Sequence, residues 1–180
     1  PSVPFVFAIG VTGHRKDALA PAALLTVHER IRRVLESLVV QANTVHAAER
    51  QYFSADPPRL LFVSALADGA DQMATEVALD LGFELHAVLP FDRDRYRASM
   101  ADDASRARFD ALLSRATCSL ELPGWGGDDL DAYVMAGRAT VAHSDVIIAV
   151  WDGLPPRGRG GTGEVVGLAH ERGTPIMHVP

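Results

Sequence analysis

Few of the features that assign a chain to a special class are present in this sequence. Cys118 is the single cysteine among 180 residues, which excludes an internal disulfide and predicts a reducing compartment. No apolar run reaches the roughly 18 residues that a membrane span needs. No charged-then-apolar signal segment opens the sequence either. These absences predict a cytoplasmic protein that does not enter a membrane.

Basic residues are in the minority. The chain has 23 acidic residues against 17 basic ones and a formal charge of −6, which disfavours sequence-independent binding of nucleic acid. The best candidates for such binding are clustered arginines: Arg93, Arg95, Arg97, Arg106, Arg108 and Arg115. Acidic residues lie between these arginines and largely cancel their charge, so a nucleic-acid partner is not expected.

Residues with the spacing of metal ligands are also missing. The seven histidines are scattered, and neither the pair His28-Glu29 nor the pair His170-Glu171 belongs to an H-E-x-x-H motif. We therefore expect no metal site and no resident cofactor.

What the sequence does contain is the material of one globular domain over residues 1–180. Hydrophobic residues make up 48% of the chain and charged residues 22%, which suffices for a buried core. Six short, mostly continuous apolar runs recur: Val6–Val11, Leu60–Leu66, Leu85–Leu89, Ser119–Leu122, Val146–Trp151 and Ile176–Val179. Such runs are typical of strands covered on both faces, hence of a parallel sheet. Cys118, beside the fourth run, is expected in the core.

Segments with helical periodicity separate these runs. Their apolar stripes lie at 24–45, 73–81, 109–113, 130–141 and 165–169. The alternation of strands and helices predicts an α/β fold, a doubly wound, Rossmann-like three-layer sandwich around a mainly parallel sheet of five to six strands. Ligands of such sheets bind beyond the carboxyl ends of the strands, so the loops there are the places to search for function.

Glycine-rich loops follow three of the predicted strands, at 10–15, 64–71 and 151–164. Glycine lets the backbone approach a ligand closely, and helix N-termini offer unpaired N–H groups at the positive end of the dipole. An acidic protein could therefore hold a phosphate through its backbone. The candidate ligand-binding residues in these loops are Thr12, Gly13, His14, Arg15, Ser64, Asp68, Gly69, Asp71, Trp151, Asp152, Gly153, Gly160, Gly161, Thr162 and Gly163.

Some of these residues also have a plainer interpretation. Asp68 and Asp71 are equally typical of helix N-caps, and Arg15 suits either phosphate pairing or a solvated loop. Trp151 suits either stacking on a base or packing. Ser64 lacks a G-x-S-x-G elbow and is interpreted as a hydroxyl that faces the ligand rather than a nucleophile.

Two further observations limit the site. The G-x-G-x-x-G fingerprint is absent after the first strand, so a dinucleotide dehydrogenase is not supported. The charged and aromatic segment 90–96, which follows the third strand, is either a flap over the pocket or a solvated connection.

Together the loops resemble the SLOG superfamily, named for the DNA-processing protein DprA and the LOG cytokinin-activating enzymes. The matching segments are Gly10–Arg15, Ser64–Asp71, Met135–Arg138, Ser144–Ala149 and Gly160–Glu164. The second is similar to the "GA-x-GAD" element of uncharacterised bacterial members, and Trp151–Gly153 resembles their sensor-like branch. The resemblance implies a Rossmann-like domain that binds a nucleotide or nucleotide-derived small molecule and self-associates, for example as a homodimer.

LOG enzymes cleave the N-glycosidic bond of nucleoside 5′-monophosphates with an arginine and a glutamate. The resemblance places Arg138 at the arginine position, whereas the glutamate position falls on Gly167 and Glu164 lies one turn earlier. The usual Pro-Gly-Gly is replaced by Trp151–Gly153, and an insert, Leu154–Arg159, follows. Arg138 and Glu164 are therefore the candidate catalytic pair of an alternative function, a phosphoribohydrolase.

Three functions remain in competition at this point. A nucleotide sensor or ligand-binding domain is the leading hypothesis, a LOG-like hydrolase is its rival, and a module for assembly is the third. The sequence ends one residue after an apolar run, which also fits a domain excised from a longer protein whose other part supplies the output.

Overall fold

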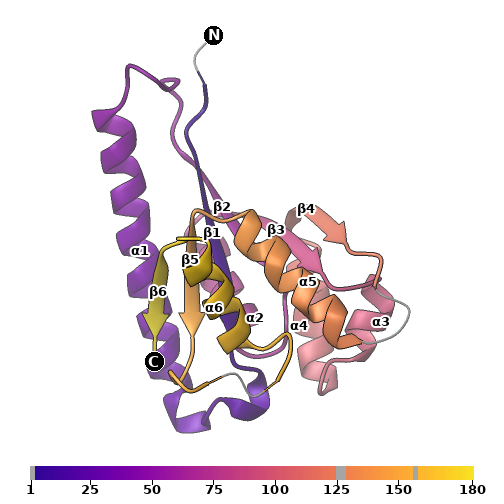
Figure 1. Ribbon diagram of the computed structural model, residues 1–180. Coiled ribbons are helices and arrows are strands. Elements are labelled where there is room, and N and C mark those ends of the chain that lie inside the picture. Colours follow the sequence, from indigo (N-terminus) through magenta and orange to yellow (C-terminus); the bar gives the residue numbers. More distant parts are fainter. Residues whose placement is uncertain (1–2, 125–128, 156–157) are drawn as a thin grey trace.

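The computed structural model describes residues 3–124, 129–155 and 158–180 (Figure 1). The strands are β1 (Val6–Gly13), β2 (Arg59–Ser64), β3 (Glu84–Leu89), β4 (Ala116–Glu121), β5 (Val146–Val150) and β6 (Ile176–Val179). The helices are α1 (Leu24–Ala48), α2 (Ala70–Asp80), α3 (Arg93–Ala98), α4 (Asp103–Leu113), α5 (Asp129–Ala142) and α6 (Thr162–Glu171), with short 3-10 turns at Lys16–Ala18 and Pro21–Ala23.

The six strands form one sheet in the order β4-β3-β2-β1-β5-β6, and every neighbouring pair is parallel. Helices α1, α2 and α4 pack along one face, while α5 and α6 pack together on the other (Figure 1). The doubly wound, Rossmann-like three-layer sandwich that the sequence predicts is therefore confirmed.

The strand order changes direction between β1 and β5. From β1 the chain builds the sheet outward through β2, β3 and β4, and it then returns to the other side of β1 with β5 and β6. The last residues of the two central strands lie side by side, with Thr12 paired to Ala149 and Gly13 to Val150. Since the loops after these strands run to opposite faces, a crevice opens between them.

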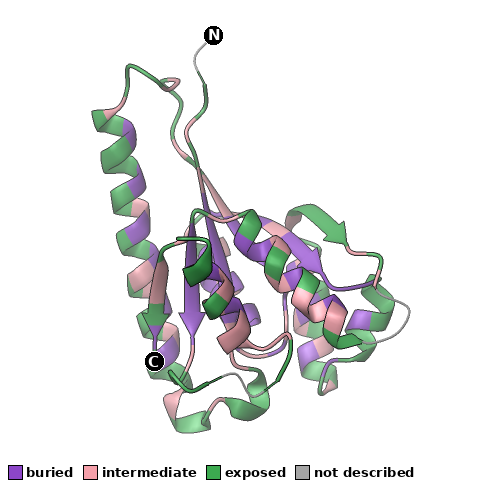
Figure 2. Cartoon of the chain, viewed as in Figure 1, coloured by how far each residue is buried: buried purple, intermediate pink, exposed green. Residues whose placement is uncertain are grey.

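The core lies between the sheet and its helices, as the burial colours of Figure 2 show. All five residues of β5 are buried, and Ile9, Phe62 and Leu85 are fully so. The stripe of α1 is buried from Val27 to Ala42 but not at its ends. With 25 residues, α1 is about 37 Å long, roughly twice the length of a six-residue strand, so its C-terminal end extends past the sheet (Figure 1).

β4 differs from the prediction. Residues 117–121 of this strand are all exposed, including Cys118, which the sequence analysis placed in the core. The physical reason is that β4 is an edge strand, and α5 packs over β1 and β3 instead of covering it. The apolar run at 119–122 is too short to distinguish an edge strand from a central one.

The segment 90–96 is solvated only in its middle: residues 92–95 are exposed, whereas both of its ends are buried. Phe91 and Tyr96 are each 1% exposed, and their rings meet edge to face with centroids 5.6 Å apart. Asp92 caps α3 by accepting a hydrogen bond from the Arg95 N–H at 3.0 Å. The segment therefore folds back into the core and brings an aromatic residue toward the crevice.

No helix within the described residues is long and apolar enough to cross a membrane.

Candidate functional site

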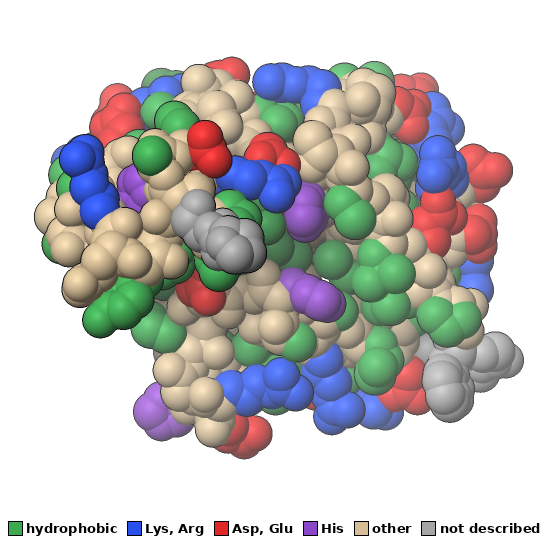
Figure 3. Space-filling view, turned by 90° about the horizontal axis from the view of Figure 1, so that it is seen from above, with side chains coloured by type: hydrophobic (Ala, Val, Ile, Leu, Met, Phe, Trp, Pro, Cys, Tyr) green, Lys and Arg blue, Asp and Glu red, His purple; other side chains and the backbone are tan. Residues whose placement is uncertain are grey.

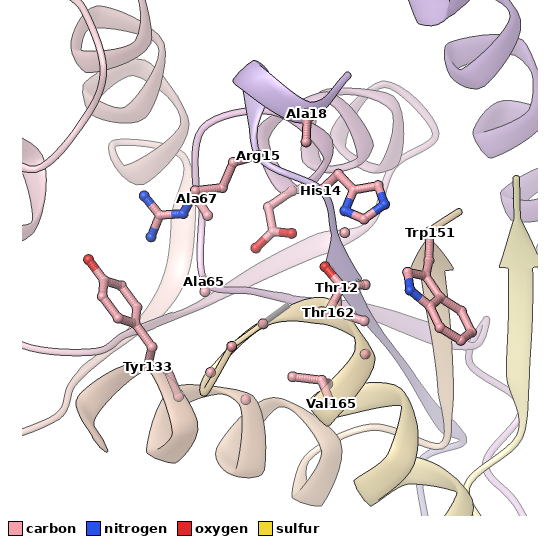
Figure 4. Close-up of a pocket in the computed structure, with 18 of the residues that line it drawn as sticks. Thr12, His14, Arg15, Ala18, Ala65, Ala67, Tyr133, Trp151, Thr162 and Val165 are labelled. Atoms are coloured by element: carbon pink, nitrogen blue, oxygen red, sulfur yellow. The ribbon is translucent and has the colours of Figure 1, made fainter. Parts of the chain in front are cut away.

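A cavity of about 610 Å³ occupies the crevice at the carboxyl ends of the strands. Its walls come from the loops after β1, β2 and β5, the N-terminus of α6 and one side of α5. In Figure 4, Arg15 and Tyr133 lie on one side of the cavity, His14 and Trp151 lie on the other, and Thr12 and Thr162 lie between them. Its volume is within the range of small-molecule sites.

The structure brings most of the candidate ligand-binding residues to this cavity. Those that line it are Thr12, Gly13, His14, Arg15, Asp71, Trp151, Asp152, Gly160, Gly161, Thr162 and Gly163. Four others do not line it: Ser64, Asp68, Gly69 and Gly153. Each of the four has a local structural explanation.

Ser64 is fully buried behind the cavity wall. Its hydroxyl oxygen accepts hydrogen bonds from the Leu66 N–H and from the hydroxyl of Thr75, both at 3.0 Å. The side chain therefore holds the end of β2 against α2 and does not face a ligand, contrary to the expectation from its place at a strand end.

Gly69 joins the loop after β2 to the loop after β1. The Lys16 N–H donates to the Asp68 carbonyl at 3.2 Å, and the Ala70 N–H donates to the His14 carbonyl at 3.0 Å. Gly69 adopts a φ of +108°, and a Cβ there would lie 2.5 Å from the Lys16 nitrogen. Glycine is thus required for the approach of backbone to backbone, not of backbone to ligand.

Gly13 serves packing as well as the cavity. A Cβ at this position would lie 2.4 Å from the Cβ of Ala70 and 2.9 Å from that of Val150. The absence of a side chain therefore lets β1, β5 and α2 converge at the cavity wall, which remains backbone at this point.

The residues after β5 contact the loop after β1 and strand β6. The Asp152 N–H donates to Nε2 of His14 at 3.2 Å, which joins the loops after β1 and β5. Trp151 packs its ring on His178 with centroids 5.7 Å apart while still lining the cavity. Gly153 has a φ of +78° with open space around it, so its role is to turn the chain.

The N-terminus of α6 faces the cavity without a side-chain cap. Its N-cap residue is Gly161, and Thr162 and Gly163 begin the helix along the cavity wall. Helix N-termini leave N–H groups without intrahelical acceptors. This end of the cavity can therefore accept an anion through backbone donors and the helix dipole.

Arg138 and Glu164, the candidate catalytic pair, lie outside this cavity. Both line a second hollow of about 310 Å³ between α5 and α6, whose walls share Gly160, Gly163 and Val165 with the first. The Glu164 carboxylate accepts a hydrogen bond from the Gly160 N–H at 2.6 Å. The structure thus brings Arg138 and Glu164 to one hollow, but the Glu164 carboxylate already accepts a hydrogen bond from the backbone of Gly160. The insert 154–159 includes residues 156–157, which lie outside the described residues.

The acidic residues near α2 do not cap it. The N-cap residue is Gly69, and no side chain makes the capping hydrogen bond, so the helix-cap interpretation of Asp68 and Asp71 is wrong. Asp71 is 6% exposed and lines the cavity. Its burial raises the pKa of its carboxyl from 3.8 to about 7.

Two tyrosines that the sequence analysis did not select also line the cavity. Tyr96 comes from α3 and Tyr133 from α5. The Arg15 guanidinium lies over the Tyr133 ring, 5.1 Å from its centroid, and 3.6 Å from the Asp68 carboxylate. Arg15 is therefore anchored against the wall. Tyr96 follows a strand end and could have been found by that rule, whereas Tyr133 carries no such signal.

Within the part of the chain that the structure describes, no group of three or more His, Cys, Asp or Glu side chains is arranged to hold a metal ion.

These observations define a Rossmann-like α/β domain with a ligand-sized cavity at its topological switch point. Comparison of the sequence with protein-family models finds no match, and neither does comparison with curated proteins. The structure, however, is similar to DNA processing protein A from Streptococcus pneumoniae (TM-score 0.56, 19% identity, 99% of this chain and 50% of that one). DNA processing protein A from Helicobacter pylori, described by its single-stranded DNA binding mode, is also similar (TM-score 0.56, 15% identity, 97% and 65%).

A third similar structure is the molybdenum cofactor carrier protein from Chlamydomonas reinhardtii (TM-score 0.50, 19% identity, 96% of this chain and 76% of that one). The chain spans half the length of the first structure and 65% of the second. At these identities the likeness shows a common fold, which agrees with the fold that the SLOG resemblance implies.

Proposed function

We propose that this chain is a SLOG-type binding domain that holds a nucleotide or nucleotide-derived small molecule in the cavity at the switch point, as a sensor does. The observation that carries the proposal is the uncapped N-terminus of α6, which lines a cavity of nucleotide size together with the loops after β1 and β5. Backbone N–H groups there can bind a phosphate although the chain as a whole is acidic.

The pairing of the arginines favours a small ligand over nucleic acid. In the group at 93–115, five of the six arginines form ion pairs: Arg93 with Glu121, Arg95 with Asp129, Arg97 with Asp110, Arg106 with Asp103 and Arg108 with Glu76. Figure 3 looks onto the face at the amino ends of the strands, where acidic and basic side chains are also interspersed. A duplex or single strand would have to compete with these acidic partners.

A thermal-shift screen with nucleoside monophosphates, cyclic nucleotides, NAD and ADP-ribose at millimolar concentration tests the proposal. A ligand at 100 times its dissociation constant adds about 2.7 kcal/mol of stability, which should raise the midpoint by about 5 to 10 °C in a chain of this size. Thr162→Glu, which places a carboxylate at the N-terminus of α6, should abolish the shift. Thr44→Glu, the same change on the exposed side of α1, should keep it. No shift with any member of the panel would contradict the proposal.

A hydrolase is the second candidate, because Arg138 and Glu164 line one hollow. If the chain is a phosphoribohydrolase, it should release free base from a nucleoside 5′-monophosphate, and Arg138→Ala should lower the rate by at least about a hundredfold. Glu164→Gln keeps an acceptor for the Gly160 N–H but removes the charge, so an equal loss in this variant would assign a chemical role to Glu164 beyond its hydrogen bond to Gly160. Chromatographic assay of base release decides, and no release from any nucleotide would reject this function.

A further inference from the structure

The wall of the cavity contains a group of polar side chains from four separate elements, three of them buried and one, Arg15, exposed. Arg15 follows β1, Asp68 and Asp71 flank the start of α2, Tyr96 belongs to α3 and Tyr133 to α5. Asp68 and Asp71 are only 4% and 6% exposed, and Tyr96 is 1% exposed. Four of the five line the cavity, and Asp68 lies behind Arg15.

The charges of this group do not balance. Among the residues that the structure describes, Arg15 is the cation that acts on Asp71, and its guanidinium is also 3.6 Å from Asp68. Asp68 and Tyr96 are the other titratable groups that act on Asp71 or respond to its charge, and neither supplies a positive charge. Two buried carboxylates thus share one guanidinium, which leaves the group short of positive charge.

Hydrogen-bond donors are short in the same place. Oδ1 of Asp68 is buried and has no hydrogen-bond partner, although a buried carboxylate oxygen normally has at least one. Burial raises the pKa of Asp71 and the neighbouring Asp68 contributes in the same direction, although a backbone hydrogen bond from Ala67 and the charge of Arg15 act against them. Asp68 lies behind Arg15 and outside the cavity, whereas Asp71 lines it, so a ligand that brought N–H donors to this wall would meet the Asp71 carboxylate.

We infer that Asp71 is the recognition point for a base edge with two adjacent N–H donors, so that the preferred ligand is a guanine nucleotide. This inference rests on the proposed function. The ring N1–H and the 2-amino group of guanine point in parallel, and an ionised carboxylate can accept both. With the phosphate at the N-terminus of α6, the base would lie on the side of Arg15 and Tyr133, which Figure 4 shows, where Asp71 also lines the cavity.

Adenine fits this wall less well, because its edge presents one amino donor beside an acceptor nitrogen. It would pair with Asp71 only in the protonated form, and the pair would not supply the missing donors. Hypoxanthine keeps the ring N–H of guanine but lacks the 2-amino group. The three bases therefore differ in the feature that the inference invokes, while ribose and phosphate stay constant.

The test is calorimetric titration of the protein with GMP, IMP and AMP at pH 8. The wild-type chain should bind GMP about tenfold more tightly than IMP, since a two-donor pair discriminates by about that factor. Asp71→Asn should lower the affinity for GMP, so that the variant binds GMP and IMP equally. Asp17→Asn, the same change at an exposed residue on the rim of the same cavity, should leave the preference intact.

The pH dependence gives a second readout. Because the pair requires ionised Asp71, the ratio of GMP affinity in the wild-type chain to that in Asp71→Asn should rise about tenfold between pH 6 and pH 8. Comparison with the variant removes the titration of the ligand phosphate, which both proteins experience.

The outcomes separate this inference from the proposed function. Equal binding of GMP, IMP and AMP, tighter binding of AMP, or a GMP preference that persists in Asp71→Asn would overturn the role of Asp71 while leaving nucleotide binding established. Absence of binding for all three nucleotides at millimolar concentration would overturn the inference, and a negative screen with the wider panel would overturn the proposed function with it.

Discussion

Replacing Asp71 with asparagine is expected to raise the free energy of unfolding at pH 8 by about 4 kcal/mol and to flatten its dependence on pH. The pKa of this carboxyl rises from 3.8 to about 7 on folding because the group is buried. The folded state therefore holds its proton more tightly than the unfolded state does. The contribution of Asp71 to stability is fully present below about pH 4 and is lost as the pH rises through about 7.

Urea unfolding of both proteins at several pH values between 5 and 8 measures this effect. Groups distant from Asp71 contribute equally to both curves, so the difference between the two curves reports on Asp71 together with its interactions with Asp68 and Arg15. The difference should be less than half as large at pH 5 as at pH 8, because the loss accumulates between about pH 4 and about pH 7. Parallel curves would mean that the Asp71 carboxyl is solvated in the folded state. Asp17→Asn, at an exposed position, should leave the curve of the wild-type chain unchanged.

This prediction also explains why a destabilising group would persist. A buried carboxylate costs folding free energy when it is ionised, and groups with strongly shifted pKa values are concentrated at functional sites. Asn at position 71 would provide stability at neutral pH but not the charge that an N–H-rich base edge requires. Stability and ligand recognition thus make opposite demands on one side chain.

The fold could be predicted because its signal is repeated along the chain. Each of the six apolar runs overlaps a strand, and all five periodic stripes overlap a helix. The exposure of β4 could not be predicted, because whether a strand is covered depends on where helices distant in the sequence pack. Cys118 was misplaced for that reason.

The site could be predicted as a set of loops but not as a set of side chains. The strand-end rule leads to Thr12–Arg15 and to the start of α6, and both line the cavity. It cannot tell in which direction a side chain points, so Ser64 was expected to face the ligand although it bonds Thr75. Tyr133 reaches the cavity from an apolar stripe on α5, where no local pattern separates a wall residue from a core residue.

Gly69, where the loop after β2 contacts the loop after β1, should be among the residues of the chain that tolerate substitution least. Gly69→Ala is expected to lower the free energy of unfolding by at least about 3 kcal/mol, since it combines an unfavourable backbone conformation with a steric conflict. The φ of +108° is one that residues with a side chain rarely adopt, and the new Cβ would lie within 2.7 Å of three atoms of the backbone at residues 14–16. Those atoms belong to the main chain and cannot rotate away.

Gly82→Ala is the matched control, because Gly82 also has a positive φ, of +87°, but open space around it. It should lower stability by only about 1 kcal/mol, the effect of the backbone conformation alone. Denaturant unfolding followed by circular dichroism compares the two variants. A larger loss in Gly69→Ala would show that the contact between the loops, which also positions His14 and Arg15 at the cavity, depends on this glycine. Equal losses would show that the two loops can separate without cost, and the cavity wall would then be less rigid than its hydrogen bonds indicate.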